Sequence, residues 1–310
     1  MIGHDDIIAA YKRVQPHIRR TPVIDLDADT LGLGAPLTLK LEQLQVTGSF
    51  KVRGAFNNMA GADLPDAGVV AISGGNHGAA VGYAATRLGV KSTVFVPGMI
   101  ADKVKIARME GFGATVRIAE GGVDQAFGEY EAFAKDTGAL AVHPYGSPGT
   151  LAGQGTVGLE FEDQRPKLDT LFVSVGGGGL IGGIAAWYES RVKVVAVETV
   201  GTSTLDKTLK GTLPPDFKVS GISASGLGAS SIGELPMDII RAHVAENVVV
   251  TDDDVYEAQR RLWAGARVIG EPGGVTALAA LTSGAYVPRQ GERIGVLICG
   301  GNTAPGWFLA

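Results

Sequence analysis

The sequence is poor in the two residues that most often hold disulfides or transition metals. It has one cysteine, Cys299, and five histidines among 310 residues. A single thiol has no partner for an internal disulfide, and the histidines show no paired ligand spacing, so we predict no metal site. The first six residues carry no basic segment and lead into no apolar run. A secretory signal is therefore not indicated, and the cytoplasm is the expected location.

Long apolar stretches and clusters of basic residues are also missing. Gly, Asp or Lys interrupts every apolar run before it reaches the roughly 18 residues of a membrane span, so no membrane partner is expected. The 27 Lys and Arg residues are scattered among 32 Asp and Glu, which gives a net charge of -5 and no basic stripe for nucleic acid. With 45% hydrophobic and 19% charged residues, the composition is that of an ordinary globular protein.

What the sequence does contain is a regular alternation of short apolar runs with longer segments of helical period. Such alternation predicts parallel strands that are buried on both faces and joined by crossover helices. The expected strands are Val69–Ile72, Ser92–Val96, Thr115–Ile118, Leu140–Val142, Leu171–Val175, Val192–Val197 and a final Val296–Ile298. A later helix is expected from Asp252 to about Val268, capped by Thr251 or Asp252. The sequence therefore predicts an α/β protein.

The order of these segments predicts a small domain inserted into a larger one. No Pro/Ser linker, low-complexity tract or repeat separates two independent halves. The expected strands between 69 and 142 form a self-contained series, with an N-terminal segment before them and a longer C-terminal series after them. We therefore predict a large domain from residues 1–57 and 148–310, a small domain from residues 67–145, and a ligand cleft between the two.

Glycine is abundant, with 46 copies, and its longest run predicts a phosphate site. Gly176, Gly177, Gly178 and Gly179 follow an expected buried strand and begin an expected helix. Backbone N–H groups without side chains can approach an anion closely, and the helix N-terminus adds a partial positive charge. No Lys-Ser or Lys-Thr pair follows, which argues against a nucleoside triphosphate loop. A merely flexible or tightly packed turn is the alternative interpretation.

A second candidate is the lysine of the segment Thr47–Ala55. Lys51 lies between Phe50 and Val52 at an expected helix start. An amine desolvated there would have a lowered pKa, and a neutral amine can condense with an aldehyde and later act as a base. The alternative is a surface lysine at a helix N-terminus.

Two further segments follow expected strands. Ser73-Gly74-Gly75-Asn76-His77-Gly78 gathers hydroxyl, amide and free N–H groups that suit a carboxylate or a phenolic oxygen. Its alternative is an ordinary helix start, with Asn76 as the N-cap and His77 solvated. The other segment, Ile298–Asn302, lies at the carboxyl edge of the sheet, where ligands of open α/β folds bind. Cys299 by itself is more often a packed apolar residue than a ligand.

These four segments, in this order, resemble the fold-type II pyridoxal-phosphate enzymes, specifically the serine/threonine dehydratase and serine racemase family. The pairing of Ser-Phe-Lys-x-Arg-Gly at 49–54 with Gly-Gly-Asn-His at 74–77 carries the resemblance, which runs over nearly the full chain. Further matching segments are His143-Pro144, Ala152–Thr156, Ala196–Glu198, Gly228–Gly233 and Glu271–Gly274. The resemblance implies two open, mostly parallel twisted sheets with flanking helices, the tryptophan synthase β-like fold.

The resemblance also implies a role for each segment, with pyridoxal 5'-phosphate as the cofactor and an amino acid as the substrate. Lys51 would form a Schiff base with the cofactor and later act as the base, and Ser73 would share in catalysis. The remaining cofactor-binding residues would be Phe50, Asn76, the four glycines 176 to 179, Gly226, Glu271 and Cys299. The substrate would be held by Ser73, Gly75, Asn76 and His77. Relatives are commonly dimers, so a homodimer is expected.

Three departures from the family pattern indicate which activity to expect. The family usually places a serine near the pyridine nitrogen, and Cys299 stands there; a thiol is a weak neutral partner, which favours β-elimination over a long-lived carbanion. Racemases carry a second serine directly after the position of Ser73, where this chain has Gly74. Glu198 matches a cation-binding glutamate of the family, but the aspartate six positions later is Thr204, so a cation site is not expected.

We therefore predict a lyase that converts a 3-hydroxy amino acid, such as L-threonine or L-serine, to a 2-oxo acid and ammonia. Three alternatives stay open: a dehydratase for a bulkier, phenylserine-type substrate, a serine racemase, and a non-catalytic protein that binds the cofactor or an amino acid. Alignment on His143 places Ala126, Phe127 and Tyr145 around the substrate side chain, which is the reason to consider the bulkier substrate.

Overall fold

The computed structural model describes residues 2–304 and contains two sheets. The larger has the order β1 (Val23–Leu26), β2 (Leu37–Leu41), β10 (Ile294–Ile298), β7 (Thr170–Ser174), β8 (Lys193–Thr199), β9 (Val244–Val250). The smaller has the order β5 (Thr115–Ala119), β4 (Ser92–Pro97), β3 (Val69–Ile72), β6 (Leu140–Ala141). Every neighbouring pair is parallel except β1 and β2. The α/β prediction with two mostly parallel sheets is confirmed.

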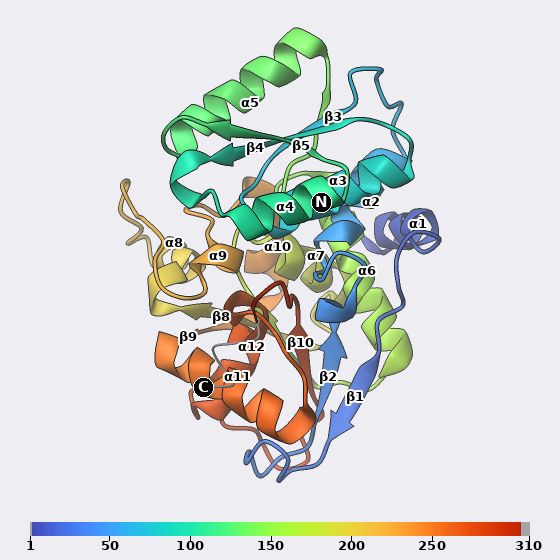
Figure 1. Cartoon of the computed structure of the whole chain (residues 1–310). Helices are drawn as coiled ribbons and strands as arrows, with labels where there is room; N and C mark the ends of the chain where they lie inside the picture. The colour runs from blue at the N-terminus through green and yellow to red at the C-terminus, as the bar shows by residue number, and fades with distance from the viewer. Residues whose placement is uncertain (1, 305–310) are drawn as a thin grey trace.

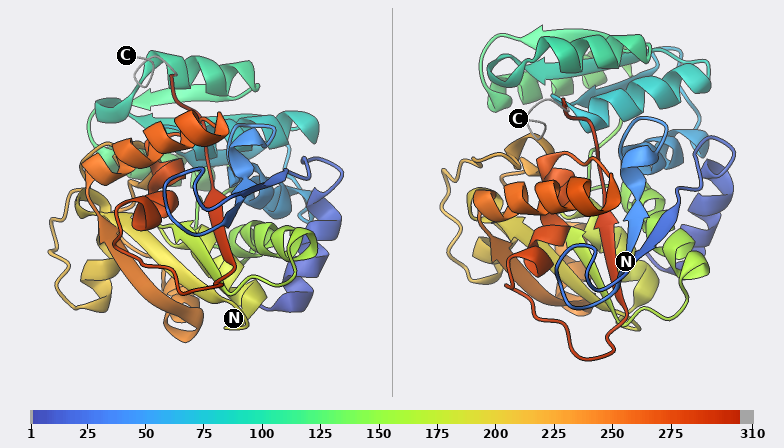
Figure 2. Two further views of the ribbon diagram at one scale, coloured as in Figure 1. Left: turned by 90° about the horizontal axis from the view of Figure 1, so that it is seen from below. Right: turned by 60° about the horizontal axis from the view of Figure 1, so that its bottom comes forward.

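Helices cover both faces of the six-stranded sheet (Figure 2). One face packs on α11 (Asp252–Ala266) and α12 (Pro272–Thr282), and the other on α6 (Pro148–Gln164), α7 (Gly179–Tyr188) and α10 (Glu234–His243). Side chains alternate between the faces along β10, where Val296 and Ile298 join the first core and Leu297 and Cys299 the second. The alternation directs the Cys299 thiol toward the α6 and α7 face.

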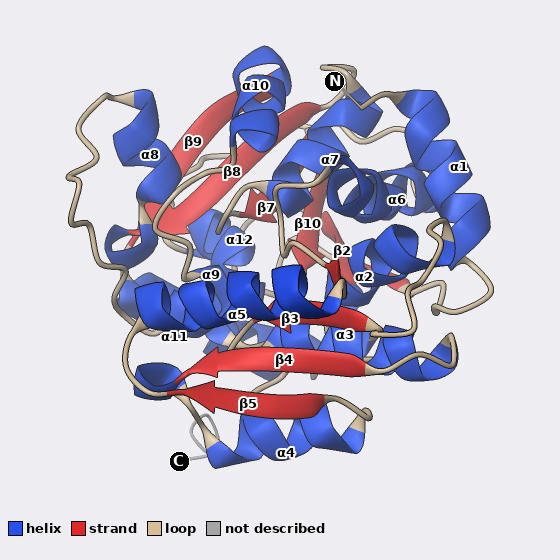
Figure 3. Cartoon of the chain, turned by 90° about the horizontal axis from the view of Figure 1, so that it is seen from above, coloured by secondary structure: helices blue, strands red, loops and turns tan. Residues whose placement is uncertain are grey.

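The four-stranded sheet lies above the larger one in Figure 1, and Figure 3 shows it from above. Helix α5 (Val123–Thr137) covers its outer face, and α3 (Asn76–Arg87) and α4 (Lys103–Gly111) lie between it and the six-stranded part. The predicted strand Val69–Ile72 coincides with β3. The other predicted strands of this sheet differ from the observed bounds by one residue.

The remaining helices connect the two sheets or cap their edges. They are α1 (His4–Val14), α2 (Lys51–Ala60), α8 (Thr204–Leu209) and α9 (Ala224–Leu227), with short 3-10 turns η1 (Glu42–Leu44), η2 (Gly98–Ile100) and η3 (Val200–Thr202). Helix α2 shares a core with β3 and α3 of the smaller sheet. The domain boundaries at residues 57, 67, 145 and 148 stay a prediction. Within residues 2–304, no helix is long and apolar enough to cross a membrane.

Candidate active site

A cavity opens at the carboxyl edge of the six-stranded sheet, where β7 and β10 end. It is lined by residues from all four segments that the sequence singled out: Phe50, Lys51, Asn76, the glycines 176 to 179, and Cys299. Gly226 and Glu271, the other two residues expected to bind the cofactor, also line it, together with Tyr145, Ser174, Val175, Leu180, Ile181, Leu227 and Gly273. The chain therefore brings together side chains that lie more than 200 positions apart in sequence.

Lys51 begins α2, and the segment before it is paired to the segment after β10. The backbone N–H of Phe50 donates to the Cys299 carbonyl at 3.1 Å, and the N–H of Gly301 donates to the Gly48 carbonyl at 2.9 Å. The Lys51 ammonium donates to the Pro144 carbonyl at 2.9 Å and lies 5.2 Å from the centroid of the Phe50 ring. Desolvation lowers the pKa of Lys51 to about 8. The amine is therefore directed into the cavity and is neutral at mildly alkaline pH.

The glycine run between β7 and α7 leaves no room for side chains. A Cβ at Gly177 would overlap the Tyr145 ring, and one at Gly179 would lie 2.7 Å from the Tyr145 Cα. Gly178 has a φ of 88°, which only glycine adopts without strain. The first N–H groups of α7 have no partner within the helix. The run is thus an N–H-rich cradle at a helix N-terminus, the geometry that binds phosphate.

Asn76 is held from two sides at the start of α3. Its amide NH₂ donates to Glu271 Oε1 at 2.6 Å, and its Oδ1 accepts from the Asn302 amide at 2.7 Å. Burial raises the pKa of Glu271. The N-cap of α3 is Gly75, so the alternative of Asn76 as an ordinary cap is wrong. Asn302 orients Asn76, a role that the sequence analysis did not assign.

His77 and Ser73 lie in the same segment as Asn76, and the side chains of both form hydrogen bonds within the protein. The His77 ring is buried, and its Nε2 donates to the Val142 carbonyl at 2.9 Å. Desolvation and the nearby Lys51 lower the pKa of His77 to about 3, so the ring is neutral. The Ser73 hydroxyl accepts from the Gly75 N–H at 3.1 Å. The alternative of a solvated His77 is therefore wrong.

Cys299 directly follows β10 and lines the cavity. Its side chain is buried, with Sγ 3.7 Å from the Gly273 carbonyl oxygen. Burial and, to a smaller extent, the charge of the neighbouring Glu271 raise the pKa of Cys299 to about 12. The residue therefore presents a neutral thiol, as the sequence analysis assumed.

The three residues expected around a substrate side chain lie in different parts of the structure. Ala126 and Phe127 lie on α5, on the outer face of the smaller sheet (Figure 1), so their placement around the substrate was wrong. The alignment failed because that stretch has no motif to fix its register. Tyr145 does line the cavity, with its ring lying over Gly177.

Glu198 makes contacts that suit a helix cap. Its carboxylate accepts from the backbone N–H groups of Leu205 and Asp206 at 2.7 and 2.8 Å, and from the Asn247 amide at 3.3 Å. Desolvation raises its pKa to about 7. Among residues 2–304, no group of three His, Cys, Asp or Glu could hold a metal ion. Both oxygens of Glu198 are thus used in holding the start of α8.

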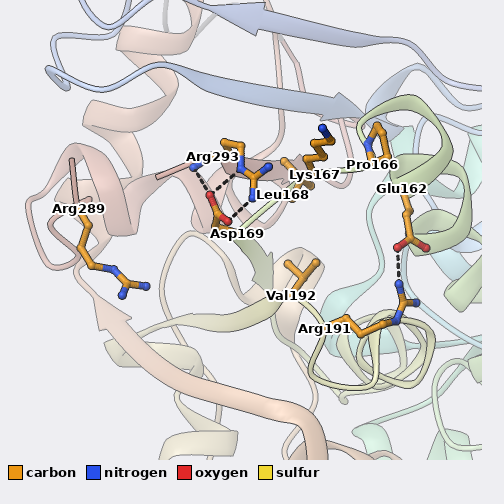
Figure 4. Close-up of a pocket in the computed structure, with 9 residues that line it drawn as sticks. All are labelled: Glu162, Pro166, Lys167, Leu168, Asp169, Arg191, Val192, Arg289 and Arg293. Carbon is orange, nitrogen blue, oxygen red and sulfur yellow. Dashed lines mark hydrogen bonds and ion pairs between the residues drawn. The ribbon is translucent and has the colours of Figure 1, made fainter. Parts of the chain in front are cut away.

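A second hollow, of about 460 Å³, lies at the opposite end of the six-stranded sheet (Figure 4). Its lining includes residues that directly precede β7, β8 and β10, and so faces the amino ends of these strands. Arg293 is paired with Asp169, Nη2 to Oδ1 at 2.5 Å, and Arg191 is paired with Glu162. Ligands of open α/β folds bind at the carboxyl ends of strands. We therefore place the chemistry in the cavity around Lys51.

Comparison with known proteins agrees with this placement. The model of the pyridoxal-phosphate dependent enzyme family matches residues 14–300. An L-threonine ammonia-lyase of Thermotoga maritima is 33% identical over 97% of this chain and 76% of its own length, and a phenylserine dehydratase of Ralstonia pickettii is 34% identical over 96% and 92%. The structure of maize serine racemase superposes with a TM-score of 0.91 at 30% identity, over 98% of this chain and 94% of that one.

The chain belongs to the family of pyridoxal-phosphate dependent enzymes. Within it, these relatives assign the chain to the threonine dehydratase and serine racemase group, as predicted, and pyridoxal phosphate is its cofactor. The cavity fits that cofactor. It offers an amine with a lowered pKa for the aldehyde, a side-chain-free cradle at a helix N-terminus for the phosphate, and a buried neutral thiol for the ring.

Proposed function

We propose that this enzyme removes water and then ammonia from a 3-hydroxy amino acid, such as L-threonine or L-serine, and releases a 2-oxo acid. The observation that carries the choice of elimination is Gly74. It provides no hydroxyl in the loop that leads to Asn76 of the cavity, whereas Lys51 provides one amine in the cavity. A single base suffices to break the Cα–H bond, while racemisation needs a second group to return a proton from the other face.

Each residue of the cavity has a defined task in this proposal. The cradle at 176–179 binds the cofactor phosphate, Phe50 and Gly226 flank its ring, and the Asn76 amide bonds its phenolic oxygen. Ser73, Gly75, Asn76 and His77 hold the substrate carboxylate and so orient the Cα–H bond. For this, the Gly75 N–H exchanges its bond to the Ser73 hydroxyl for one to the substrate. Pyridoxal phosphate supplies an aldehyde that bonds the amino group and a ring that accepts the electrons released at Cα. Lys51 takes the Cα proton and, as an ammonium, returns a proton to the departing β-hydroxyl, which leaves as water. Hydrolysis of the released enamine then gives the 2-oxo acid and ammonia.

A bulkier 3-hydroxy amino acid is the second candidate substrate. Tyr145 lines the cavity with an aromatic ring. One relative, which matches 96% of this chain and 92% of its own length, is a phenylserine dehydratase. An aromatic wall favours an aromatic side chain through offset or edge-to-face contact. The holoenzyme should be tested on L-threonine, L-serine and L-threo-phenylserine, with the 2-oxo acid and ammonia measured together. Accumulation of the D-enantiomer without oxo acid would refute the dehydratase.

The lowered pKa of Lys51 predicts the pH dependence of cofactor loading. Only the neutral amine attacks the aldehyde, so below a pKa of about 8 the rate of loading should rise with pH by about tenfold per unit and level off above it. Stopped-flow absorbance of the apoenzyme mixed with pyridoxal phosphate at pH 6 to 9.5 measures this rate. A rate that still rises about tenfold per unit at pH 9.5, as for an amine with the ordinary lysine pKa of 10.5, would show that the amine is not desolvated.

A further inference from the structure

Gly74 is in contact with a residue that the sequence gives no reason to place there. A Cβ at position 74 would lie 2.7 Å from Cδ1 of Ile100 and 3.2 Å from its Cγ1. Gly74 is not among the glycines with positive φ, so its backbone conformation is open to any residue. The obstacle to a side chain at this position is therefore Ile100 and not the backbone.

Ile100 ends η2, the turn between β4 and the segment that leads into α4. Its side chain is 50% exposed, so one side packs on the loop at Gly74 and the other faces solvent. Ile is branched at Cβ, and its χ1 angle is restricted. A Cβ at position 74 would require the Cδ1 methyl to rotate away and Cγ1 to give by a few tenths of an ångström.

The region around Ile100 is also tied to the six-stranded part of the chain. The Lys105 ammonium, in the first turn of α4, donates to the Ser225 hydroxyl of α9 at 2.8 Å. The Ser225 carbonyl oxygen would lie 3.9 Å from a Cβ at Gly75. Because α9 also contributes Gly226 to the cavity, the start of α4, which follows Ile100 in the chain, is tied to an element that lines the cofactor site.

We propose that Ile100 is a specificity-determining residue, which fills the space of a side chain at position 74 and keeps an acid–base group from that side of the substrate. The proposal rests on the proposed function. In racemisation, the Cα–H bond breaks and its proton passes to Lys51. A new Cα–H bond then forms with a proton from a donor on the other face, and solvent reprotonates that donor. At Gly74 the place of such a donor is taken by methyl and methylene groups.

The functional test compares Gly74→Ser with the double variant Gly74→Ser/Ile100→Ala. Each holoenzyme is given L-serine, and D-serine and pyruvate are measured by chiral chromatography. Gly74→Ser alone should leave the ratio of D-serine to pyruvate within about twofold of the parent. The double variant should raise the ratio by at least about tenfold, which is less than the roughly 10²-fold or more that a well-positioned acid–base group contributes. An equal rise in both variants would overturn the proposal, as would no rise in the double variant while its pyruvate formation persists.

A thermal unfolding cycle tests the contact itself, without turnover. Gly74→Ala should lower the unfolding midpoint of the parent by about 2 °C or more, and the loss should be smaller when Ile100→Ala is also present. Ile118→Ala on β5, which removes an isoleucine of similar exposure (55%), is the matched control and should not change the effect of Gly74→Ala. Equal losses in all three backgrounds would contradict the contact. If the parent makes no oxo acid from any substrate, the proposed function fails, whereas this cycle still decides whether Ile100 blocks position 74.

Discussion

Replacing Lys51 with alanine should lower formation of the 2-oxo acid by at least about 10³-fold, because one residue serves as both the covalent anchor and the base. The structure supports this expectation through the position of the amine, which lies in the cavity beside the glycine cradle and Cys299. Turnover is measured by coupling the oxo acid to lactate dehydrogenase. In parallel, borohydride reduction and peptide mass spectrometry should find a cofactor adduct on Lys51 in the parent and none in the variant.

Lys91→Ala is the control for this experiment. Lys91 is exposed at the start of β4, away from the cavity, and its removal should leave activity within about twofold. A parent that carries the adduct on Lys51 but turns over no amino acid would favour the non-catalytic binding protein. A Lys51→Ala variant that keeps its activity would refute the proposed site.

The second large expected effect concerns the free energy of unfolding and depends on Arg53, two residues after Lys51. The Arg53 guanidinium is fully buried and donates to both oxygens of Glu42, at 2.8 and 2.7 Å, and to Glu160 at 3.1 Å. The buried Lys40 ammonium donates to the same Glu160 at 2.5 Å. Burial on its own would raise the pKa of Glu42, but the charge and hydrogen bond of Arg53, together with Lys40 and Thr21, outweigh it and the pKa is lowered. The four charges therefore compensate one another out of contact with water.

Arg53→Met should lower the free energy of unfolding by about 3–5 kcal/mol, because it leaves buried carboxylates without their partner. The change keeps much of the side-chain volume, so the loss reports charge more than packing. Urea unfolding of the apoenzyme, followed by far-UV circular dichroism, measures it.

Arg20→Met provides the matched control, since Arg20 pairs with Asp163 at 2.5 Å but the two side chains are 51% and 62% exposed. Removing an exposed pair should cost less than about 1 kcal/mol. Equal losses for Arg53→Met and Arg20→Met would show that the buried network does not hold the start of α2.

Sequence patterns were sufficient where the local signal and the tertiary environment agree. The apolar run at β3 follows Gly68 and is followed by Ser73 and Gly74, and its limits were predicted correctly. The same holds for the start of α11, where the Thr251 hydroxyl accepts from the Asp254 N–H in a capping box. The pairing of a glycine run with a strand end also predicted the cradle, because the helix N-terminus is a local property.

Prediction failed where a contact joins distant parts of the chain. The strand β2 (Leu37–Leu41) was missed because Lys40 interrupts its apolar pattern, and only the partner Glu160 on α6 makes that lysine a core residue. In β9, Glu246 and Asn247 break the pattern in a similar way. Ile100 lies in no recognisable motif, and Asn302 ends a segment that was recognised without a role for its side chain. The contacts of these residues with Gly74 and Asn76 could be found only in the structure.

The pairing between the segments around Ser49 and Gly300 has a consequence for how the protein is made. Ser49 and Gly300 form an antiparallel bridge, and the Asn302 amide bonds the Thr47 carbonyl across 255 positions. A ribosome must therefore translate residues 299–302 before the lysine near the beginning of the chain can be fixed in place. A growing chain would carry the reactive amine for most of its synthesis without a finished pocket around it, and so without the means to act on a substrate.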